Sequence, residues 1–320
     1  MPPMSGTEAN IQIFKPFGEA FELTKKILFQ PFDFAKWCVI GFAAFLAGHF
    51  GGGGFNFPSR WNFRPSQTHA INFPDLEQWK PWLLVGIPAF VIVVLAVILL
   101  LVWLKARGNF VFTDCIVHNQ GAIVAPWREY REEGNSYFGF ILAVAFGSMI
   151  VFAVMFVLFA ALGFMGFDRG KTGAVTSFGP LVFLFLFWLL YALVLNLVTY
   201  LMPLVMYRQR CGAIDGLREV LRLIVSNIGV MILFALFGMV LLLAMIVIGA
   251  IVSCLTCCIA ALPYVGTVIL LPVFVCLRAF GLCFLRQFGP DYDVWAGVAP
   301  PEFSPILSSA SPAEPPPPPL

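Results

Sequence analysis

The chain has 320 residues, of which 60% are hydrophobic and only 11% are charged. A soluble protein carries roughly 25% charged residues, so a soluble fold of this length could not cover its surface with so few charges. The net charge of +2 is small, and no nucleic-acid partner is expected. Because helices satisfy their own backbone hydrogen bonds in lipid, the composition predicts an all-α membrane protein.

The N-terminal part of the chain mixes polar and apolar residues. Residues 1–16 are predicted to form a cytoplasmic tail. A cleavable signal peptide places its apolar stretch directly after a short basic lead, whereas Glu8, Glu19 and Glu22 come before the first apolar stretch of this chain. We therefore expect the first membrane span to be retained.

Two predicted helices follow this tail. Phe17–Leu28 has apolar residues at helical spacing on one face and Glu and Lys on the other, which indicates an amphipathic helix lying in the headgroup plane. Ala35–Phe50 is predicted to be the first span, although a span usually needs about 20 residues. A re-entrant or interfacial segment is the alternative for this stretch.

The largest predicted outer loop comes next. It begins with the glycine run Gly51–Gly54 and continues through Phe55–Trp82, which is rich in aromatic residues, Asn and Pro. We expect this loop to lie on the lipid surface, and an external binding or packing flap is the alternative. The glycine run lacks the Lys and Ser/Thr that would complete a phosphate-binding loop.

Five further apolar stretches are predicted to cross the membrane. They are Trp82–Leu104, Tyr137–Met165, Phe178–Tyr207, Ile228–Ser253 and Cys258–Leu277. Amphipathic segments at about Gly121–Gly134 and at Gly212–Ser226 precede the third and fifth spans. Pro88, Pro203 and Pro272 fall within spans and are expected to kink them. The predicted fold is a polytopic membrane helix bundle of about six transmembrane helices with three cytoplasmic amphipathic interfacial helices.

The basic residues predict the orientation, since Lys and Arg collect in cytoplasmic loops. Most of them lie in the N-terminal segment, in the second and fourth loops and after the sixth span. The opposite loops contain only Arg60, Arg64, Lys80, Arg169 and Lys171. Six spans with both termini in the cytoplasm account for this split, whereas five spans would scatter the basic residues over both faces. We therefore predict a multi-pass protein of the cytoplasmic (inner) membrane.

The order of the elements suggests a threefold internal repeat. Each odd-numbered span is preceded by an amphipathic segment and followed by an outer loop and a second span. Gly-Ala-Ile begins both the second and the third amphipathic segments, at 121–123 and 212–214. The alternative is a chance similarity of the kind that any hydrophobic chain shows.

Polar residues inside the predicted spans are few. No Asp, Glu, Lys or Arg lies well within the six apolar cores, although ion- and proton-coupled transporters usually keep such a residue there. The polar candidates are Ser148, Asn196, Thr199 and Tyr200. Asn196 and Thr199 are predicted to bond between helices, and contact with a substrate is the alternative. His49, at a span end, is expected to be an interfacial residue.

A cysteine cluster lies at the turn between the fifth and sixth spans. Cys254, Cys257 and Cys258 form C-x-x-C-C, but a zinc site needs about four ligands and no histidine or second cysteine pair is nearby in the sequence. We expect small apolar packing at this turn, with a disulfide as the alternative.

A second cluster, Asp114, Cys115 and His118, resembles a nucleophile site only superficially. Nothing in the sequence supplies the third group that would orient a base toward the nucleophile. No catalytic, cofactor-binding or metal-binding residue is assigned, no cofactor is expected, and the protein is predicted not to be an enzyme.

Three parts of the chain are predicted: the tail 1–16, a six-span membrane domain at 17–290 and a Pro-rich disordered cytoplasmic tail at 291–320. The last part contains five consecutive prolines, Pro315–Pro319. Such a composition cannot bury a core and stays extended or disordered. A spacer is expected there, and binding to a proline-reading partner is the alternative.

Three segments carry a resemblance to known proteins. They are Gln30–Asp33 ahead of the glycine run, Pro126–Tyr130, and Phe284–Tyr292. Together they resemble an uncharacterised family of prokaryotic multi-pass membrane proteins over about residues 17–293, which implies no particular activity. More loosely, the alternation of surface helix and paired spans is similar to the membrane region of some glycerophosphodiester phosphodiesterases. This chain lacks their soluble barrel, so their hydrolytic activity is not implied.

Two functions from different classes fit the sequence. A non-enzymatic scaffold or accessory protein, acting through lipid and partner contacts, follows from the absence of motifs and of buried charge. A carrier or flippase-like permease for an apolar or lipid-like solute follows from the repeated unit and from the prolines at matching span ends. The expected partners are membrane lipids, together with a protein partner or a second copy of the chain.

Overall fold

The computed structural model describes residues 14–49, 76–168, 170–256 and 262–296. Every regular element in these ranges is a helix, so the predicted all-α class is confirmed for them. In chain order the helices are α1 Phe14–Phe29, α2 Phe34–Leu46, α3 Leu76–Val117, α4 Val124–Glu129, α5 Arg131–Asp168, α6 Gly170–Gln209, α7 Ala213–Ser226, α8 Ile228–Leu255, α9 Pro263–Ile269 and α10 Leu271–Arg286.

Four of these helices are long and apolar enough to cross a bilayer. Their apolar parts are Val85–Val117 in α3, Arg131–Leu162 in α5, Phe178–Gln209 in α6 and Ile228–Leu255 in α8. They correspond to the predicted second to fifth spans. Apolar helices of this length are stable when lipid covers them, and the chain is a membrane protein.

The first and sixth predicted spans correspond to shorter helices. α2 has 13 residues, which at about 1.5 Å per residue reach roughly 20 Å, less than the ~30 Å hydrocarbon core of a bilayer. Within the predicted Cys258–Leu277, α9 ends at Ile269 and α10 begins at Leu271. Pro272 lies in the first turn of α10 instead of kinking a continuous helix, because proline has no N–H to donate and is tolerated there.

The three predicted amphipathic segments differ in how far they stay helical. α1 contains the whole of Phe17–Leu28, and α7 covers the predicted third segment from Ala213 onward. The predicted Gly121–Gly134 helix is divided at Tyr130, where α4 has ended and α5 has not begun. Ser136 accepts a hydrogen bond from the backbone N–H of Ala213 at 2.8 Å, which satisfies one of the free donors at the start of α7.

Helix α1 is held by the other end of the chain. It packs against α10 and buries Ala20, Leu23 and Ile27, whose spacing places them on one face. Its opposite face exposes Phe14, Phe21 and Phe29. Protein therefore covers most of the apolar face that the sequence assigned to the membrane surface, while these three phenylalanines remain exposed.

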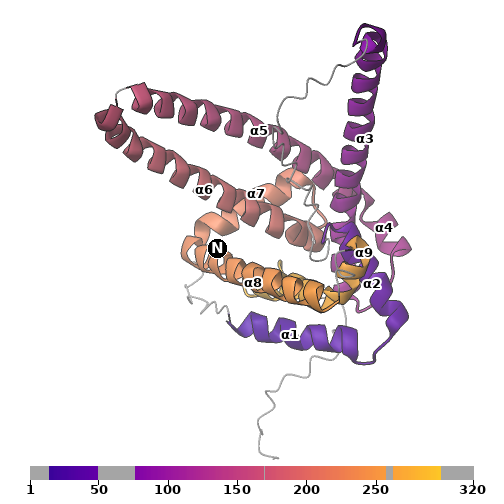
Figure 1. The fold of residues 1–320 in the computed structure, drawn as a ribbon. Helices are drawn as coiled ribbons and strands as arrows, with labels where there is room; N and C mark the ends of the chain where they lie inside the picture. The colour runs from indigo at the N-terminus through magenta and orange to yellow at the C-terminus, as the bar shows by residue number, and fades with distance from the viewer. Residues whose placement is uncertain (1–13, 50–75, 169, 257–261, 297–320) are drawn as a thin grey trace, which may run out of the picture.

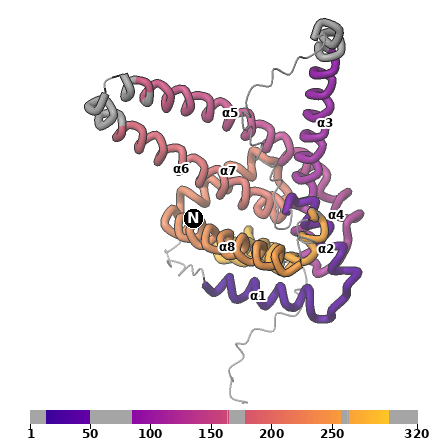
Figure 2. Tube along the Cα trace, viewed as in Figure 1, coloured from indigo at the N-terminus to yellow at the C-terminus, as the bar shows by residue number. Residues whose placement is uncertain are grey.

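The long helices leave a common centre in different directions (Figure 1). α5 and α6 pack along each other as a hairpin that projects to one side, and the N-terminal half of α3 projects to another. α1 and α8 run below them in this view. Figure 1 places the end of α5 and the start of α6 at the far tip of the hairpin, away from the centre, and the coloured trace in Figure 2 shows the other ends of α5 and α6 reaching that centre.

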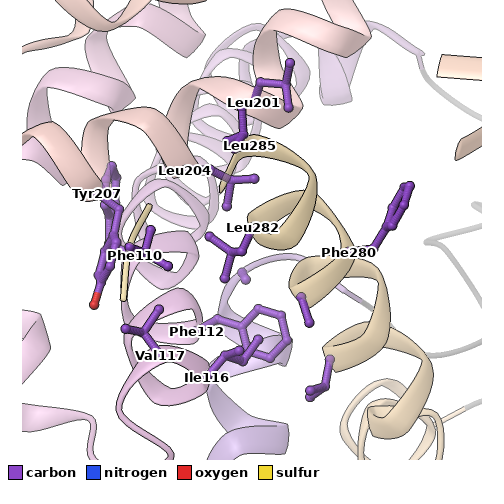
Figure 3. Packing of buried hydrophobic residues seen from close by; sticks show 14 of the residues in the cluster. Phe110, Phe112, Ile116, Val117, Leu201, Leu204, Tyr207, Phe280, Leu282 and Leu285 are labelled. Carbon is purple, nitrogen blue, oxygen red and sulfur yellow. The ribbon is translucent and has the colours of Figure 1, made fainter. Parts of the chain in front are cut away.

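The buried core lies where these helices meet (Figure 3). It contains Phe110 and Phe112 from α3, Leu201 from α6, and Phe280 and Leu282 from α10. α10 buries every residue from Arg278 through Leu285. A helix that is buried on all sides is the central element of a bundle, and α10 takes that place here.

Two glycines allow close approach within this core. A Cβ added at Gly108 of α3 would lie 2.5 Å from the carbonyl carbon of Leu46 at the end of α2. A Cβ added at Gly281 of α10 would lie 2.7 Å from the hydroxyl oxygen of Tyr200 in α6. Both distances are well below a favourable contact between non-bonded atoms. Only glycine therefore fits at these two crossings as they stand.

The first residues after 290 belong to the packed structure. Tyr292 donates a hydrogen bond to Oε1 of Glu219 in α7 at 2.5 Å, and Arg286 pairs with Asp293 at 3.3 Å. Trp295 is 6% exposed. The segment up to Ala296 is thus tied to α7 and α10, and the remainder of the predicted tail lies outside the described residues.

Candidate functional site

Three of the four polar residues predicted inside the spans meet in a single cleft between α5 and α6. Its volume is about 330 Å³, and we call it the hairpin cleft. It is lined by Ser148, Val151, Phe152, Trp188, Tyr191, Ala192, Leu195, Asn196 and Thr199. The sequence analysis found the small polar residues of this site but missed Tyr191 and Trp188. The missed signal is a spacing: Trp188, Tyr191 and Leu195 follow one another at intervals of three and four residues, which places them on one face.

A hydrogen bond joins the two helices within the hairpin cleft. Ser148 Oγ of α5 and Tyr191 Oη of α6 are 3.2 Å apart, and either can donate. Val151 and Phe152 come one turn after Ser148 and lie on the same side of α5. The cleft therefore has two hydroxyl groups at one point and apolar walls beside them, which is the usual composition of a small-ligand site.

Thr199 and Asn196 differ in how their polar side chains are used. The Thr199 hydroxyl donates to the Leu195 carbonyl of its own helix at 2.7 Å, so the expectation that this side chain bonds between helices is wrong. Asn196 is exposed, and the described part of the chain offers its side-chain amide no hydrogen-bond partner. The Asn196 amide is consequently a polar group of the cleft whose hydrogen-bonding capacity is unsatisfied among the described residues.

The fourth predicted polar residue, Tyr200, lies outside the hairpin cleft. Its hydroxyl donates to the carbonyl of Leu277 in α10 at 2.7 Å. Tyr137 of α5 makes a similar bond to the carbonyl of Thr199 in α6 at 2.9 Å. Both tyrosines connect helices by satisfying backbone carbonyls, so Tyr200 has a structural role.

A buried cation lies in α10, where the spans predicted from the sequence contained none. Arg278 is 4% exposed and donates a hydrogen bond to Oδ1 of Asn109 in α3. Its guanidinium carbon is 5.6 Å from the ring centroid of Phe112. No carboxylate of the described ranges pairs with it, and its Nε has no hydrogen-bond partner there. The sequence analysis missed Arg278 because it ended the sixth span at Leu277, although the apolar stretch continues on the far side of Arg278.

His49 lies beside this buried group instead of at the membrane surface. Its ring centroid is 5.4 Å from that of Phe112 and 5.1 Å from that of Phe274. Its Nδ1 is buried and has no hydrogen-bond partner among the described residues. The expectation of an interfacial histidine is therefore wrong, because two core phenylalanines hold its ring.

The cluster of Asp114, Cys115 and His118 is only partly assembled. His118 Nδ1 lies 3.0 Å from Asp114 Oδ1, and the Tyr207 hydroxyl donates to the same oxygen at 2.9 Å. Cys115 is buried, and its Sγ lies 3.3 Å from the Ala122 carbonyl oxygen. The thiol is thus engaged away from the carboxylate, and the cluster connects α3 to α6 without presenting a nucleophile to a base.

An aromatic and ionic stack continues from this cluster. Tyr130 stacks on Tyr207 with ring centroids 4.8 Å apart, and the guanidinium of Arg210 lies 3.9 Å from the Tyr130 centroid. Arg210 also pairs with Glu129 and, at 3.5 Å, with Glu133. Burial raises the pKa of Tyr130 to about 12, so its phenol is neutral at physiological pH and offers a π-face to the cation.

The described residues do not assemble a metal site. Among them, no three His, Cys, Asp or Glu side chains gather closely enough to hold an ion. Cys254 carries a free, exposed thiol. Cys257 and Cys258 lie outside the described residues, as do Gly51–Gly54 and most of the predicted outer loop.

Comparison with known families places most of the chain in one group. The model of DUF7544, a family of unknown function, matches residues 11–294. This agrees with the resemblance to an uncharacterised family over nearly the same range. No curated protein and no solved structure matches the chain.

Proposed function

We propose that this chain, which belongs to the DUF7544 family of unknown function, is a non-enzymatic membrane scaffold or accessory protein that acts through lipid and partner contacts. A single observation carries the proposal. Every residue of α3 from Val85 to Leu101 is exposed, which means that this part of the helix has solvent-accessible surface on all its faces.

The length of this exposed segment matches the membrane. At about 1.5 Å per residue it reaches roughly 25 Å, close to the thickness of the hydrocarbon core. It contains no charged or hydrogen-bonding side chain. Lipid or another apolar helix must cover such a surface. Gly86, Ala89 and Ala96 are small enough to let a partner helix approach closely, which favours a helix as the occupant.

Site-specific photocrosslinking tests this proposal. A benzophenone amino acid is placed at Ile92, which is 66% exposed, and, as a control on the same helix, at Ile116, which is 0% exposed. We expect Ile92 to give a discrete protein adduct in native membranes and Ile116 to give none. Two differently tagged copies of the chain would tell a second copy from another protein. Crosslinking of Ile92 to lipid alone would reject a scaffold role.

We further propose an inner-membrane location in a prokaryote, six spans with both termini in the cytoplasm, three interfacial helices and a threefold repeat. Orientation has the clearest support. The end of α3, α7 and the second half of α10 are predicted to be cytoplasmic, and they share one core with the end of α6 and the start of α8, which the same prediction places on the cytoplasmic side of their spans. The tip of the α5–α6 hairpin lies away from it (Figure 1).

A carrier for an apolar or lipid-like solute is a second candidate, and the hairpin cleft favours it. Polar side chains inside a membrane usually face a cavity or a substrate path, and Ser148, Tyr191 and Asn196 do so here. Uptake or lipid-scrambling assays on vesicles containing the purified protein test this function. We expect transport that is lost on Asn196→Leu, and the absence of transport across a broad panel of solutes would reject it.

A further inference from the structure

The hairpin cleft lies far from both ends of the helices that form it. Ser148 is near the middle of α5, which runs from Arg131 to Asp168, and Tyr191 is near the middle of α6. At about 1.5 Å per residue, each is roughly 25 Å from the charged ends of its helix. If α5 and α6 cross the bilayer, the polar groups of the cleft therefore lie deep in the hydrocarbon region, where water does not supply partners.

The hairpin cleft contains hydrogen-bond donors that have no partner within the described ranges. The two hydroxyls of Ser148 and Tyr191 share one hydrogen bond, which leaves the second hydroxyl hydrogen free. The exposed Asn196 amide adds two N–H donors and one carbonyl acceptor. The Thr199 hydroxyl hydrogen is already committed to Leu195. A ligand that satisfies this set must carry hydrogen-bond acceptors.

The lining of the hairpin cleft also defines the charge and shape of a ligand. None of its lining residues is charged, so an ionised headgroup would be buried without a counter-charge, at high cost. Phe152 and Trp188 supply aromatic walls, which favour a flat ring. The volume of about 330 Å³ is at the lower end of the range for small-molecule sites, roughly 300–1,000 Å³.

We propose that the hairpin cleft binds a neutral, lipid-soluble molecule through a ring carbonyl, as in a quinone with an apolar tail. The carbonyl accepts hydrogen bonds from Asn196 and from the Ser148–Tyr191 pair, the ring lies against Phe152 and Trp188, and the tail extends into lipid. This inference shares with the second candidate function only the condition that α5 and α6 cross the bilayer, and it requires binding but not transport. An ester carbonyl of a neutral glyceride has the same acceptor chemistry, so the experiment must distinguish a bound glyceride from a bound quinone.

Fluorescence quenching in lipid nanodiscs tests the inference. The purified full-length chain is titrated with decyl-benzoquinone, and the same titration is run on Trp188→Phe to isolate the signal of the cleft. We expect saturable quenching that Trp188→Phe largely removes. Asn196→Leu should weaken binding by at least about tenfold, the effect of losing one well-made hydrogen bond. Ser226→Ala, which removes an exposed hydroxyl outside the cleft, should leave binding unchanged.

Competition experiments separate the sources of the carbonyl. Dioctanoylglycerol should reverse the quenching only at concentrations at least about tenfold above that of the quinone, and decanol should not reverse it. Equal or stronger competition by dioctanoylglycerol would overturn the ring-carbonyl assignment. Quenching that does not saturate, or that is equal in Asn196→Leu, would overturn the site. If Asn196→Leu is unstable, the Ser148→Ala and Tyr191→Phe pair gives the same comparison.

The outcomes for binding and for transport are independent. Saturable quinone binding without transport would support this inference and reject the carrier function. Transport of other solutes without quinone binding would do the reverse.

Discussion

Arg278 of α10 and Asn109 of α3 form a hydrogen bond in the buried centre of the protein. Asn109 is 7% exposed, and Arg278 is 4% exposed. The amide nitrogen of Asn109 donates to the Lys105 carbonyl at 2.9 Å, so its oxygen is turned toward the guanidinium. One neutral side chain is therefore the hydrogen-bond partner of a fully desolvated cation, and α10 is fixed to α3 through it.

We expect Asn109→Leu to destabilise the protein by about 2–4 kcal/mol, because the buried guanidinium loses its acceptor and cannot recover one from water. The free energy of unfolding, measured by denaturant titration in detergent micelles, checks this. The double variant Asn109→Leu with Arg278→Met is the control. It should be more stable than the sum of the two single effects predicts, since both polar partners are then gone. A cost for Asn109→Leu below about 0.5 kcal/mol would contradict a role for this bond.

A second prediction concerns the stability effect of a larger side chain at Gly108, where α2 and α3 cross. Gly108→Ala should cost about 1–3 kcal/mol, the usual range for overpacking, because the added methyl would meet the Leu46 carbonyl carbon at 2.5 Å. Gly139→Ala is the matched control, since nothing lies within 4 Å of a Cβ there and alanine favours the helix. Thermal unfolding of both variants should therefore shift in opposite directions, and equal shifts would contradict the close crossing.

The stack on Tyr130 predicts that two surface arginines differ in importance. Arg210→Ala should cost about 1–2 kcal/mol, because Arg210 lies 3.9 Å from the Tyr130 ring centroid and pairs with two glutamates. Arg222→Ala removes a single pair with Glu219, in which the Arg222 side chain is 71% exposed, and should cost less than about 0.5 kcal/mol. Unfolding free energies at low and high salt measure both. A larger loss for Arg222→Ala would be incompatible with the stack.

Tyr130 also predicts a dependence of stability on alkaline pH. Burial raises the pKa of Tyr130 to about 12 from the ordinary tyrosine value of 10.0, so the unfolded chain loses this proton first. The contribution of neutral Tyr130 to the free energy of unfolding is therefore complete below pH 10 and declines as the pH rises from 10 toward 12. Unfolding midpoints across this window should fall more steeply for the unaltered chain than for Tyr130→Phe. Parallel curves for the two proteins would show that Tyr130 is not held neutral.

The sequence predicted the four long helices, and it predicted that two of the amphipathic segments are helical. An apolar run of more than 20 residues leaves few alternatives to a helix in lipid, and the amphipathic spacing of α7 is equally clear. It did not predict the break at Leu270. A proline in the first turn of a helix and a proline inside a helix look the same in a single apolar run, and only packing around α10 decides between them.

The candidate site was predicted in part for a similar reason. Ser148, Asn196 and Thr199 are conspicuous because they are polar in apolar surroundings, whereas Tyr191 and Trp188 are common span residues and give no such signal. Whether Asn196 and Ser148 share one cleft depends on how α5 and α6 pair, a long-range relationship that spacing along either helix does not contain. Arg278 was hidden because a cation after an apolar run resembles the end of a span.

The placement of the membrane is tested most directly by single-cysteine labelling of intact cells. In a chain whose eight native cysteines are replaced, Gln120→Cys lies between α3 and α4 and Lys171→Cys lies next to the tip of the α5–α6 hairpin. We expect a membrane-impermeant maleimide to label Lys171→Cys in intact cells and Gln120→Cys only after permeabilisation. Labelling of both positions in intact cells would place them on the same side and show that α5 does not cross the bilayer.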